Sequence, residues 1–382
     1  MTTTIDGTNV STFAEGVTCT ALNGGQLGGR RNLVMNGEMK VAQRTTSSAG
    51  LGADAMTRVL DRWGLVTNTG DSATAGRVTM AQVADGPAGF ANCLKLTTTT
   101  ADTSIAAGEV LLIQQGFEGQ DLQQIYKGVS GAKQVTVSFY VKGNANATYT
   151  CELFDRDNLR TIGQAFAVTT AWNRIELTFA ADEDDGSSPF DDDNNVSLHI
   201  QIFLHGGSTF SGGTFVNNTW ANQTNNTRMA ESHTSILDST DRTFFITGVQ
   251  MELGATATPF EHRSYGEELA LCQRYLPSVK GQGRLGNGNF SSTSRAYITV
   301  SFGVDARVRP TGISYGTIGN YNLGEDGIVA PVALSALAMT LGNINGARLT
   351  CDVATTPFTA NRVAGLDGAN SSANILFDGC EI

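Results

Sequence analysis

The sequence has 382 residues, of which 40% are hydrophobic and 16% are charged, and its formal net charge is −11. This hydrophobic content excludes disorder driven by high charge. The acidic balance argues against binding nucleic acid or anionic lipid, because both need clustered Lys and Arg. The 44 glycines and only 7 prolines, with abundant Thr, Ser and Asn, favour short strands joined by many turns.

Six cysteines are scattered along the chain without a CxxC pair or a Cys/His cluster, so no zinc site is expected. They are Cys19, Cys93, Cys151, Cys272, Cys351 and Cys380. Their apolar or small neighbours indicate buried thiols in a protein assembled in a reducing cytoplasm. The first ten residues are polar, unlike a signal peptide, and no apolar run approaches the roughly 20 residues of a membrane helix. We therefore expect no membrane insertion.

Residues 1–29 are rich in Thr and Gly and show no helical periodicity. Such a segment has too few apolar side chains to build a core of its own. We predict an extended N-terminal arm that becomes ordered on a neighbouring chain.

Residues 30–262 are typical of an antiparallel β-sandwich. Apolar residues alternate over residues 134–143, 174–181, 194–206 and 241–253, which indicates strands with one face packed inward. Loops rich in Gly, Asn, Asp and Ser separate these runs, which favours a jelly roll over an alternating βαβ sheet. One short helix is expected within it, at 118–128.

Residues 263–280 predict a short amphipathic helix that links two β regions. Ser264 and Glu267 form a capping box, and Pro277 ends the helix. Apolar residues recur at helical spacing and should be buried on the sandwich or against symmetry mates, as on the axis of a trimer. They are Tyr265, Leu269, Cys272 and Leu276.

Residues 281–382 predict a second, smaller β domain. Strands are expected at 295–303, 311–319, 332–342 and 373–379. The glycine-rich run 281–288 is not flanked by a strand and a helix, as a phosphate-binding loop would be, and is interpreted as a linker. The predicted fold class is therefore mainly β: an N-terminal arm, a jelly roll, a helical linker and a C-terminal β domain.

Three sequence motifs resemble one known group of proteins. They are RRNLVMNGEMKVAQR (30–44), DRW (61–63) and GVQMELGATATPFEHRSYGEELALCQRYL (248–276). As a set they resemble the tail-fibre proteins of marine tailed bacteriophages. Residues 114–122 (QQGFEGQDL) and 300–316 also resemble parts of that family.

The resemblance implies a virion protein that is a homotrimer anchored by its N-terminus. It also implies a jelly roll similar to carbohydrate-binding modules between the first and last motifs. Its expected partners are other tail or capsid proteins, contacted through the N-terminal arm, and a host surface glycan.

The loop 181–195 (ADEDDGSSPFDDDNN) is strongly acidic, and seven of its fifteen positions are Asp or Glu. Its spacing does not match an EF-hand loop. Three interpretations stay open: a solvated acidic loop, a catalytic carboxylate pair, or a structural Ca²⁺ site that ties the loop down. The candidate Ca²⁺ ligands are Asp182, Asp184, Asp191 and Asp193. No other cofactor is expected.

Sugar recognition needs aromatic faces with amide or carboxylate partners. Trp63 and Trp172 stand at strand starts and are expected to pack in the core. Trp220 lies in the polar stretch FVNNTWANQTNNTR (215–228). We predict a glycan site formed by Trp220 with Asn218, Asn222 and Gln223. The alternative is that Trp220 packs at a subunit contact or caps the sandwich.

No catalytic motif is present: no His pair has i, i+4 spacing and no Ser lies in a GxSxG elbow. The predicted function is therefore not enzymatic. We expect a virion tail fibre that attaches the phage particle to host surface glycans. The alternatives are a purely architectural virion protein, such as an adaptor, head fibre or capsid decoration, and a fibre that cleaves polysaccharide.

Overall fold

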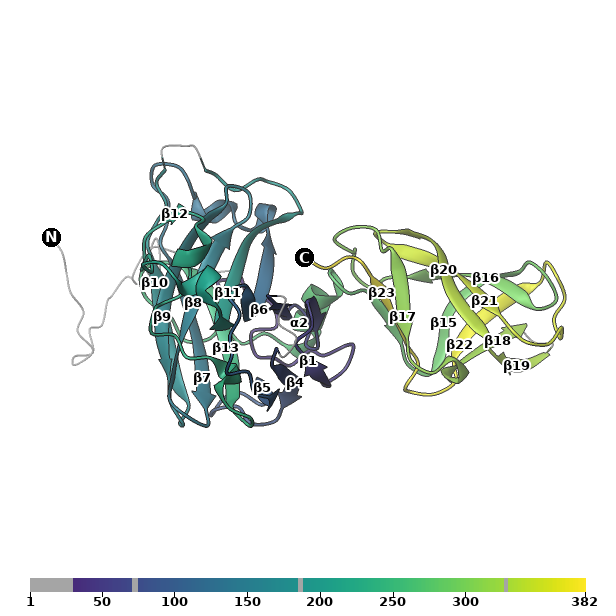
Figure 1. The fold of residues 1–382 in the computed structure, drawn as a ribbon. Coiled ribbons are helices and arrows are strands. Elements are labelled where there is room, and N and C mark those ends of the chain that lie inside the picture. The colour runs from purple at the N-terminus through teal and green to yellow at the C-terminus, as the bar shows by residue number, and fades with distance from the viewer. Residues whose placement is uncertain (1–29, 71–74, 185–187, 326–328) are drawn as a thin grey trace, which may run out of the picture.

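The computed structural model describes residues 30–70, 75–184, 188–325 and 329–382, which form two β domains joined by helix α2 (Figure 1). The predicted N-terminal arm, residues 1–29, lies outside these ranges. The described chain is mainly β, as predicted, and its sheets are antiparallel. No helix in the described ranges is long and apolar enough to cross a membrane.

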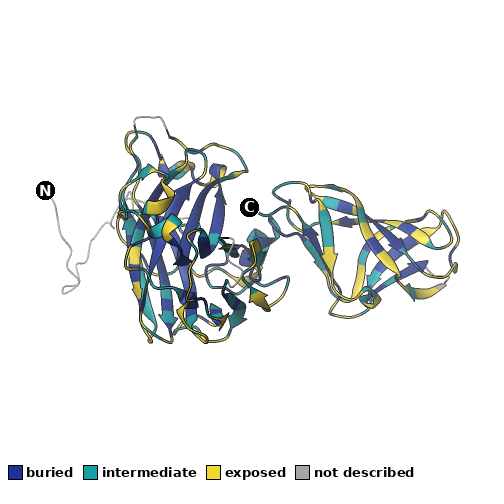
Figure 2. Ribbon diagram, viewed as in Figure 1, coloured by how far each residue is buried: buried dark blue, intermediate teal, exposed yellow. Residues whose placement is uncertain are grey.

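The first domain is a jelly-roll sandwich of two sheets. The six-stranded sheet has the order β1 (Ser47–Leu51), β4 (Arg77–Val83), β5 (Cys93–Thr100), β13 (Thr243–Leu253), β7 (Val135–Gly143) and β10 (Asn173–Phe179). The seven-stranded sheet has the order β12 (Ala221–Asn222), β9 (Arg160–Val168), β8 (Ala147–Asp155), β11 (Val196–Gly206), β6 (Glu109–Glu118), β3 (Gly64–Thr69) and β2 (Ala55–Arg58). Apolar side chains from both sheets form one buried core, and the ribbon of the strands is largely coloured as buried, dark blue, in Figure 2.

Short helical segments lie in the connections of this domain. The helix expected at 118–128 consists of two 3-10 turns, Gly119–Asp121 and Gln123–Ile125. The sequence reasoning missed the single turn α1 (Ser208–Ser211) and the 3-10 turns Asn225–Thr227 and Ile236–Asp238.

The two tryptophans expected in the core differ in the structure. Trp63 is fully buried in the core of the jelly roll, and its Nε1 donates to the Asn36 carbonyl at 3.1 Å. Trp172 is only half-buried and packs edge-on against Phe245, with the ammonium of Lys142 5.1 Å from its ring. The core prediction is therefore right for Trp63 and wrong for Trp172, which covers the outside of the six-stranded sheet.

The 30–44 motif forms no strand before Ser47, yet much of it is buried. Asn32 Oδ1 accepts from the Met251 amide at 3.1 Å, and its Nδ2 donates to the Val249 carbonyl at 3.2 Å. The Asn36 amide donates to Glu268 Oε1 at 2.5 Å. The first and last motifs of the resemblance therefore pack on each other, because buried backbone groups that no sheet satisfies need side-chain partners.

Helix α2 (Tyr265–Gln273) begins with the predicted capping box: Ser264 Oγ accepts from the Glu267 amide, and Glu267 Oε2 accepts from the Ser264 amide. Cys272 and Leu276 are buried as expected, but Tyr265 is 54% exposed. Tyr265 is therefore not buried on the sandwich, and its burial against symmetry mates stays a prediction. Buried Glu268 instead fixes the helix to the 30–44 segment.

The C-terminal domain contains two sheets around a second core. The three-stranded sheet has the order β14 (Ser278–Lys280), β23 (Asn374–Asp378) and β17 (Gly312–Tyr315). The seven-stranded sheet has the order β19 (Val329–Ala333), β18 (Tyr321–Glu325), β22 (Val363–Gly368), β15 (Gly283–Phe290), β16 (Arg295–Ser301), β21 (Gly346–Asp352) and β20 (Ala336–Asn343). One 3-10 turn, Ile318–Asn320, precedes β18.

The interpretation of 281–288 as a linker is wrong. Most of this run lies in β15, which pairs with β22 on one side and β16 on the other. A carbon atom at the Cβ position of Gly288 would lie 1.7 Å from the Tyr297 carbonyl oxygen, so this strand needs glycine to approach its neighbour.

The C-terminal residues of the sequence lie against the jelly roll at an interdomain joint formed by Arg44, Arg58, Arg307 and Glu381. Glu381 accepts from both terminal nitrogens of Arg44, at 2.9 and 2.8 Å. Arg307 donates to the Asn194 carbonyl of the jelly roll and to the Cys380 carbonyl, both at 2.8 Å. The two domains are thus linked by the chain at α2 and again by side chains.

Glu381→Gln should weaken this joint, because a neutral amide cannot accept both charged N–H groups of Arg44. We expect the free energy of unfolding to fall by about 1–2 kcal/mol, with the two domains melting as separate transitions in calorimetry. The matched control is Glu231→Gln at an exposed position. A single transition unchanged from that of the control would contradict the coupling.

Candidate functional site

A buried lysine anchors one end of the jelly roll. Lys127 is 3% exposed, and its Nζ lies 2.6 Å from Asp155 Oδ2 and 3.1 Å from Asp182 Oδ2. Arg160 reaches both oxygens of Asp182, at 3.0 and 2.9 Å. We call Lys127, Asp155, Arg160 and Asp182 the Lys127 cluster. Its charges balance, as buried ionic groups require.

The Lys127 cluster joins three segments that are distant in sequence. Lys127 follows the 3-10 turn Gln123–Ile125, Asp155 ends β8, and Asp182 starts the acidic loop. Lys127 Nζ also donates to the Ser188 carbonyl at 2.8 Å, and Gln123 Nε2 donates to the Asp191 carbonyl at 3.1 Å. The described part of the acidic loop is therefore held down by side chains of the protein.

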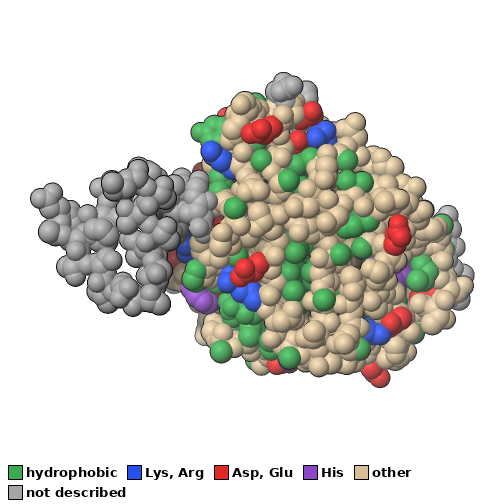
Figure 3. All heavy atoms as spheres, turned by 90° about the vertical axis from the view of Figure 1, so that its left-hand side faces the viewer, with side chains coloured by type: hydrophobic (Ala, Val, Ile, Leu, Met, Phe, Trp, Pro, Cys, Tyr) green, Lys and Arg blue, Asp and Glu red, His purple; other side chains and the backbone are tan. Residues whose placement is uncertain are grey.

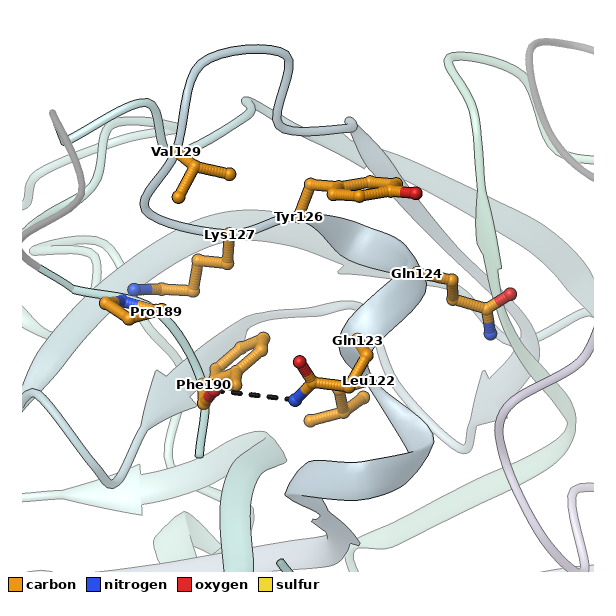
Figure 4. A pocket seen from close by; sticks show the side chains of 8 residues that line it. All are labelled: Leu122, Gln123, Gln124, Tyr126, Lys127, Val129, Pro189 and Phe190. Atoms are coloured by element: carbon orange, nitrogen blue, oxygen red, sulfur yellow. Dashed lines mark hydrogen bonds between the residues drawn. The ribbon is translucent and has the colours of Figure 1, made fainter. Parts of the chain in front are cut away.

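A shallow depression of about 440 Å³ lies above this cluster (Figure 4). We call it the Tyr126 depression; it is lined by Leu122, Gln123, Gln124, Tyr126, Lys127, Val129, Pro189 and Phe190. In Figure 4 the side chains of Tyr126 and Phe190 lie apart, and Gln123 Nε2 donates to the Phe190 carbonyl. Phe190 is only 8% exposed, so the accessible aromatic face of the depression is that of Tyr126, with Gln123 and Gln124 in the same lining.

Tyr126 is the unusual residue of this depression. The residue is 58% exposed, and its backbone has φ 55° and ψ 31°, in the left-handed region. That region is costly for an aromatic residue and is tolerated where the surroundings enforce it. Here the neighbouring Lys127 is fixed by its ion pairs, and the Gly128 amide donates to the Asp182 carbonyl at 2.7 Å. The fold thus holds Tyr126 in a conformation that exposes its ring.

The sequence-predicted glycan residues lie beside the same cluster. Trp220 is half-buried against the core, its Nε1 donates to the Ala180 carbonyl at 2.9 Å, and Lys127 Nζ lies 5.1 Å from its ring. These contacts are those of a side chain that caps the sandwich, the alternative interpretation. Asn218 Oδ1 accepts from the Ala180 amide at 3.1 Å and so supports the same segment.

The other two predicted glycan residues flank Arg160. Asn222 is exposed, and its Oδ1 lies 3.4 Å from Arg160 Nη1. The backbone N–H of Gln223 donates to the Leu159 carbonyl at 2.7 Å, and this bond fixes the short strand β12 beside β9. A glycan role of Trp220, Asn218, Asn222 and Gln223 stays a prediction.

The four candidate Ca²⁺ ligands do not converge on one point, and Asp182 and Asp184 share the partner Arg160. Asp182 is held by Lys127 and Arg160, and Asp184 lies 3.2 Å from Arg160 Nη1. Asp193 accepts from Asn195, and the Asp191 amide donates to a neighbouring carboxylate. Residues 185–187 of the loop lie outside the described ranges. Within those ranges, no group of three or more His, Cys, Asp or Glu side chains could hold a metal ion. A Ca²⁺ on Asp182 would have to displace two protein cations.

The outer face of the seven-stranded jelly-roll sheet is closed to large ligands. Phe203 is fully buried there with Met229 and packs against Phe210 of the covering segment. Arg228 donates to Glu152 at 2.9 Å and to Gln201 at 2.7 Å across the same face. The Tyr126 depression, at the end of the sandwich, is thus the more accessible aromatic surface.

His199 lies on this face and is buried. Burial, together with nearby arginines, of which Arg156 has the largest effect, lowers the pKa of His199 to about 3. The imidazole is stacked near Phe154, with ring centroids 6.4 Å apart. His199 is therefore neutral at physiological pH and packs as an aromatic side chain.

The sequence reasoning missed Tyr126, although one signal was present. An aromatic residue directly before Lys-Gly, at the end of a short helical segment with two glutamines, stands where a chain leaves a turn.

The prediction of buried, unpaired thiols is confirmed for the five described cysteines. Cys19 lies outside the described ranges.

No family model and no curated protein matches the sequence. Similar solved structures include a CBM4 structure, with 14% identity and a TM-score of 0.28 over 57% of this chain and 97% of the other. A family 11 carbohydrate-binding module of a cellulosomal cellulase of Clostridium thermocellum has 13% identity and a TM-score of 0.26 over 56% of this chain and 100% of that module.

A third similar structure is the enzymatically active domain of bacteriophage CBA120 tailspike protein 4. It has 12% identity and a TM-score of 0.29 over 58% of this chain and 21% of the other. At these identities and TM-scores the three similarities carry no weight for the ligand or the activity of this chain.

Lys127→Met should destabilise the jelly roll strongly, because it leaves Asp155 and Asp182 buried with fewer compensating charges. We expect a loss of about 3–5 kcal/mol in the free energy of unfolding, measured by chemical denaturation. Lys133→Met, at an exposed position six residues on, is the control. Equal stability of the two variants would contradict the role of Lys127.

The Ca²⁺ interpretation of the acidic loop has its own test. If EDTA lowers the melting temperature of the unsubstituted protein, that interpretation is favoured.

Proposed function

We propose that this chain is a non-enzymatic virion protein of a bacteriophage, a tail fibre whose jelly roll binds host surface glycans at the Tyr126 depression. The observation that carries the binding proposal is the exposed ring of Tyr126, held in a left-handed backbone conformation beside glutamine side chains. A sugar ring buries its apolar face on such a ring and bonds its hydroxyls to amides.

The surroundings of the depression support recognition of an uncharged sugar. Among the described residues of its lining, Lys127 alone is charged, and its ammonium is already paired with two carboxylates. Figure 3 shows the jelly roll from the left-hand side of Figure 1; Lys, Arg, Asp and Glu are scattered over this face, several of them near its top. Because the Lys127 ammonium is already paired, its desolvation on binding costs less than that of an unpaired cation.

The phage assignment rests on the sequence resemblance of the three motifs, which pack against one another at the start of the jelly roll and at α2. It includes a homotrimer and an N-terminal arm that contacts other tail or capsid proteins. The three Tyr126 depressions of one trimer would each bind weakly and together raise the avidity for a glycan surface.

Tyr126→Ala should weaken binding to host cell-surface glycans at least about tenfold, since truncating an exposed aromatic anchor typically costs more than 1 kcal/mol. Binding to immobilised host polysaccharide is measured by biolayer interferometry. Tyr265→Ala is the control, because Tyr265 is 54% exposed and lies on α2. Trp220→Ala is a poorer probe, because Trp220 also packs on the core.

The proposal fails if Tyr126→Ala and Tyr265→Ala bind equally well. Release of reducing ends from the polysaccharide by the unsubstituted protein would favour the enzymatic alternative. Unsubstituted protein that binds no host cell would favour a purely architectural role.

If the proposed assembly is right, sedimentation equilibrium of the 382-residue chain should show a homotrimer. Removal of residues 1–29 should leave glycan binding intact and prevent incorporation into phage particles, because the arm makes the virion contacts. A monomer at micromolar concentration would contradict the trimer, and normal incorporation of the truncated chain would contradict the role of the arm.

A further inference from the structure

The outer face of the C-terminal seven-stranded sheet is open along its central strands. In β16, Ala296, Ile298 and Val300 point into the domain core, and the alternate residues Tyr297 and Thr299 are exposed. This alternation follows from the pleat of a strand. The outward side chains of β15, β16 and β21 therefore form an exposed surface, unlike the closed face of the jelly-roll sheet.

An aromatic residue stands in the middle of this surface. Tyr297 is 38% exposed, and the guanidinium carbon of Arg348 lies 4.8 Å from its ring centroid. Asn289 lies opposite Tyr297 on β15, and Asn287 lies opposite Thr299. The surface thus presents a ring, two amides, a hydroxyl and a guanidinium on neighbouring strands.

Arg348 also lines a depression of about 470 Å³ that runs toward the turn between β20 and β21. Its other lining side chains are uncharged and include Thr299, Ser301, Asn343 and Asn345. In the part of the chain that the structure describes, Arg348 is therefore the one charged residue that lines this depression.

The pairing of Arg348 differs from that of the nearby arginines. Arg295 binds Asp352 at 2.6 and 2.8 Å, and Arg284 binds Asp367 at 2.8 Å. Within the described ranges, Arg348 has no carboxylate at ion-pair distance; its Nε lies 3.3 Å from the Thr340 hydroxyl. Its remaining N–H groups can donate to an oxyanion in the depression, and stacking on Tyr297 orients the guanidinium.

We propose that this surface is a second glycan-binding site, specific for a sugar that carries a carboxylate or a sulfate. The Tyr297 ring packs on the apolar face of one sugar, and Arg348 binds the anionic group of that sugar or its neighbour. The amide of Asn289 and the Nδ2 group of Asn287, whose Oδ1 already accepts from Arg284 Nη1 at 2.6 Å, bond to hydroxyl groups. Arg348, which has no carboxylate partner among the described residues, favours an anionic sugar over a neutral one.

This site is independent of the Tyr126 depression, because the two lie on different domains and are lined by different residues. The proposed function predicts an uncharged sugar at the jelly roll, whereas this site requires an anionic sugar. Loss of one therefore leaves the other unchanged, and each can fail separately.

Isothermal titration of the full-length protein with hexagalacturonate, a sulfated carrageenan tetrasaccharide and neutral cellohexaose tests the site. We expect one or both anionic probes to bind, and Arg348→Gln and Tyr297→Ala each to weaken that binding about tenfold or more. Arg295→Gln is the matched control, because Arg295 is exposed on the same strand as Tyr297 and is paired with Asp352. Tyr126→Ala should have no effect on binding of the two anionic probes.

The carboxylated and sulfated probes distinguish the two sources of negative charge. Binding of either probe supports the site if Arg348→Gln abolishes that binding. The inference is overturned if neither anionic probe binds, if cellohexaose binds the Tyr126→Ala variant as tightly as they do, or if Arg295→Gln weakens binding as much as Arg348→Gln. Thermal melting of each variant checks that it is folded.

Discussion

The buried ammonium of Lys127 is the interaction on which the end of the jelly roll depends. One charged group satisfies carboxylates from β8 and from the acidic loop and also binds the Ser188 carbonyl. Placing this group in the interior carries a large desolvation cost, which only close partners offset. Because those partners come from separate segments, the turn that presents Tyr126 cannot shift without disturbing the loop. The exposed ring is therefore a consequence of buried electrostatics beneath it.

The same balance explains why the acidic loop could not be assigned a single role from the sequence. Seven acidic residues in fifteen suggest a metal site when their partners are unknown. The partners Lys127 and Arg160 lie 55 and 22 residues before Asp182, and no local pattern pairs them with it. Trp220 posed a similar problem, because the hydrogen bond from its indole to Ala180 joins segments 40 residues apart. Local composition shows which groups need partners, but the topology determines which partners they have.

Local signals predicted the parts of the fold that depend on local chemistry. The capping box of α2 is a contact between residues three apart, and the strand at 295–303 shows a clean alternation of buried and exposed positions. The strand β15 was missed because it contains many glycines, which normally weaken strands, although here they allow close approach to β16. Asn36 was missed for another reason: it satisfies backbone groups in a buried segment without regular structure. Such segments have no periodicity that a sequence can display.

The interdomain joint relates the two candidate sites physically. A flexible linker would let the C-terminal domain sample many orientations, and simultaneous contact with one glycan surface would then cost conformational entropy. Arg44, Arg58 and Arg307 instead hold residues 380–382 against the jelly roll, in addition to the covalent link through α2. Fixing the domains in this way lowers the entropy lost when both sites bind. Two weak sites on rigidly joined domains can therefore add most of their binding free energy, which is the arrangement that attachment to a polysaccharide surface favours.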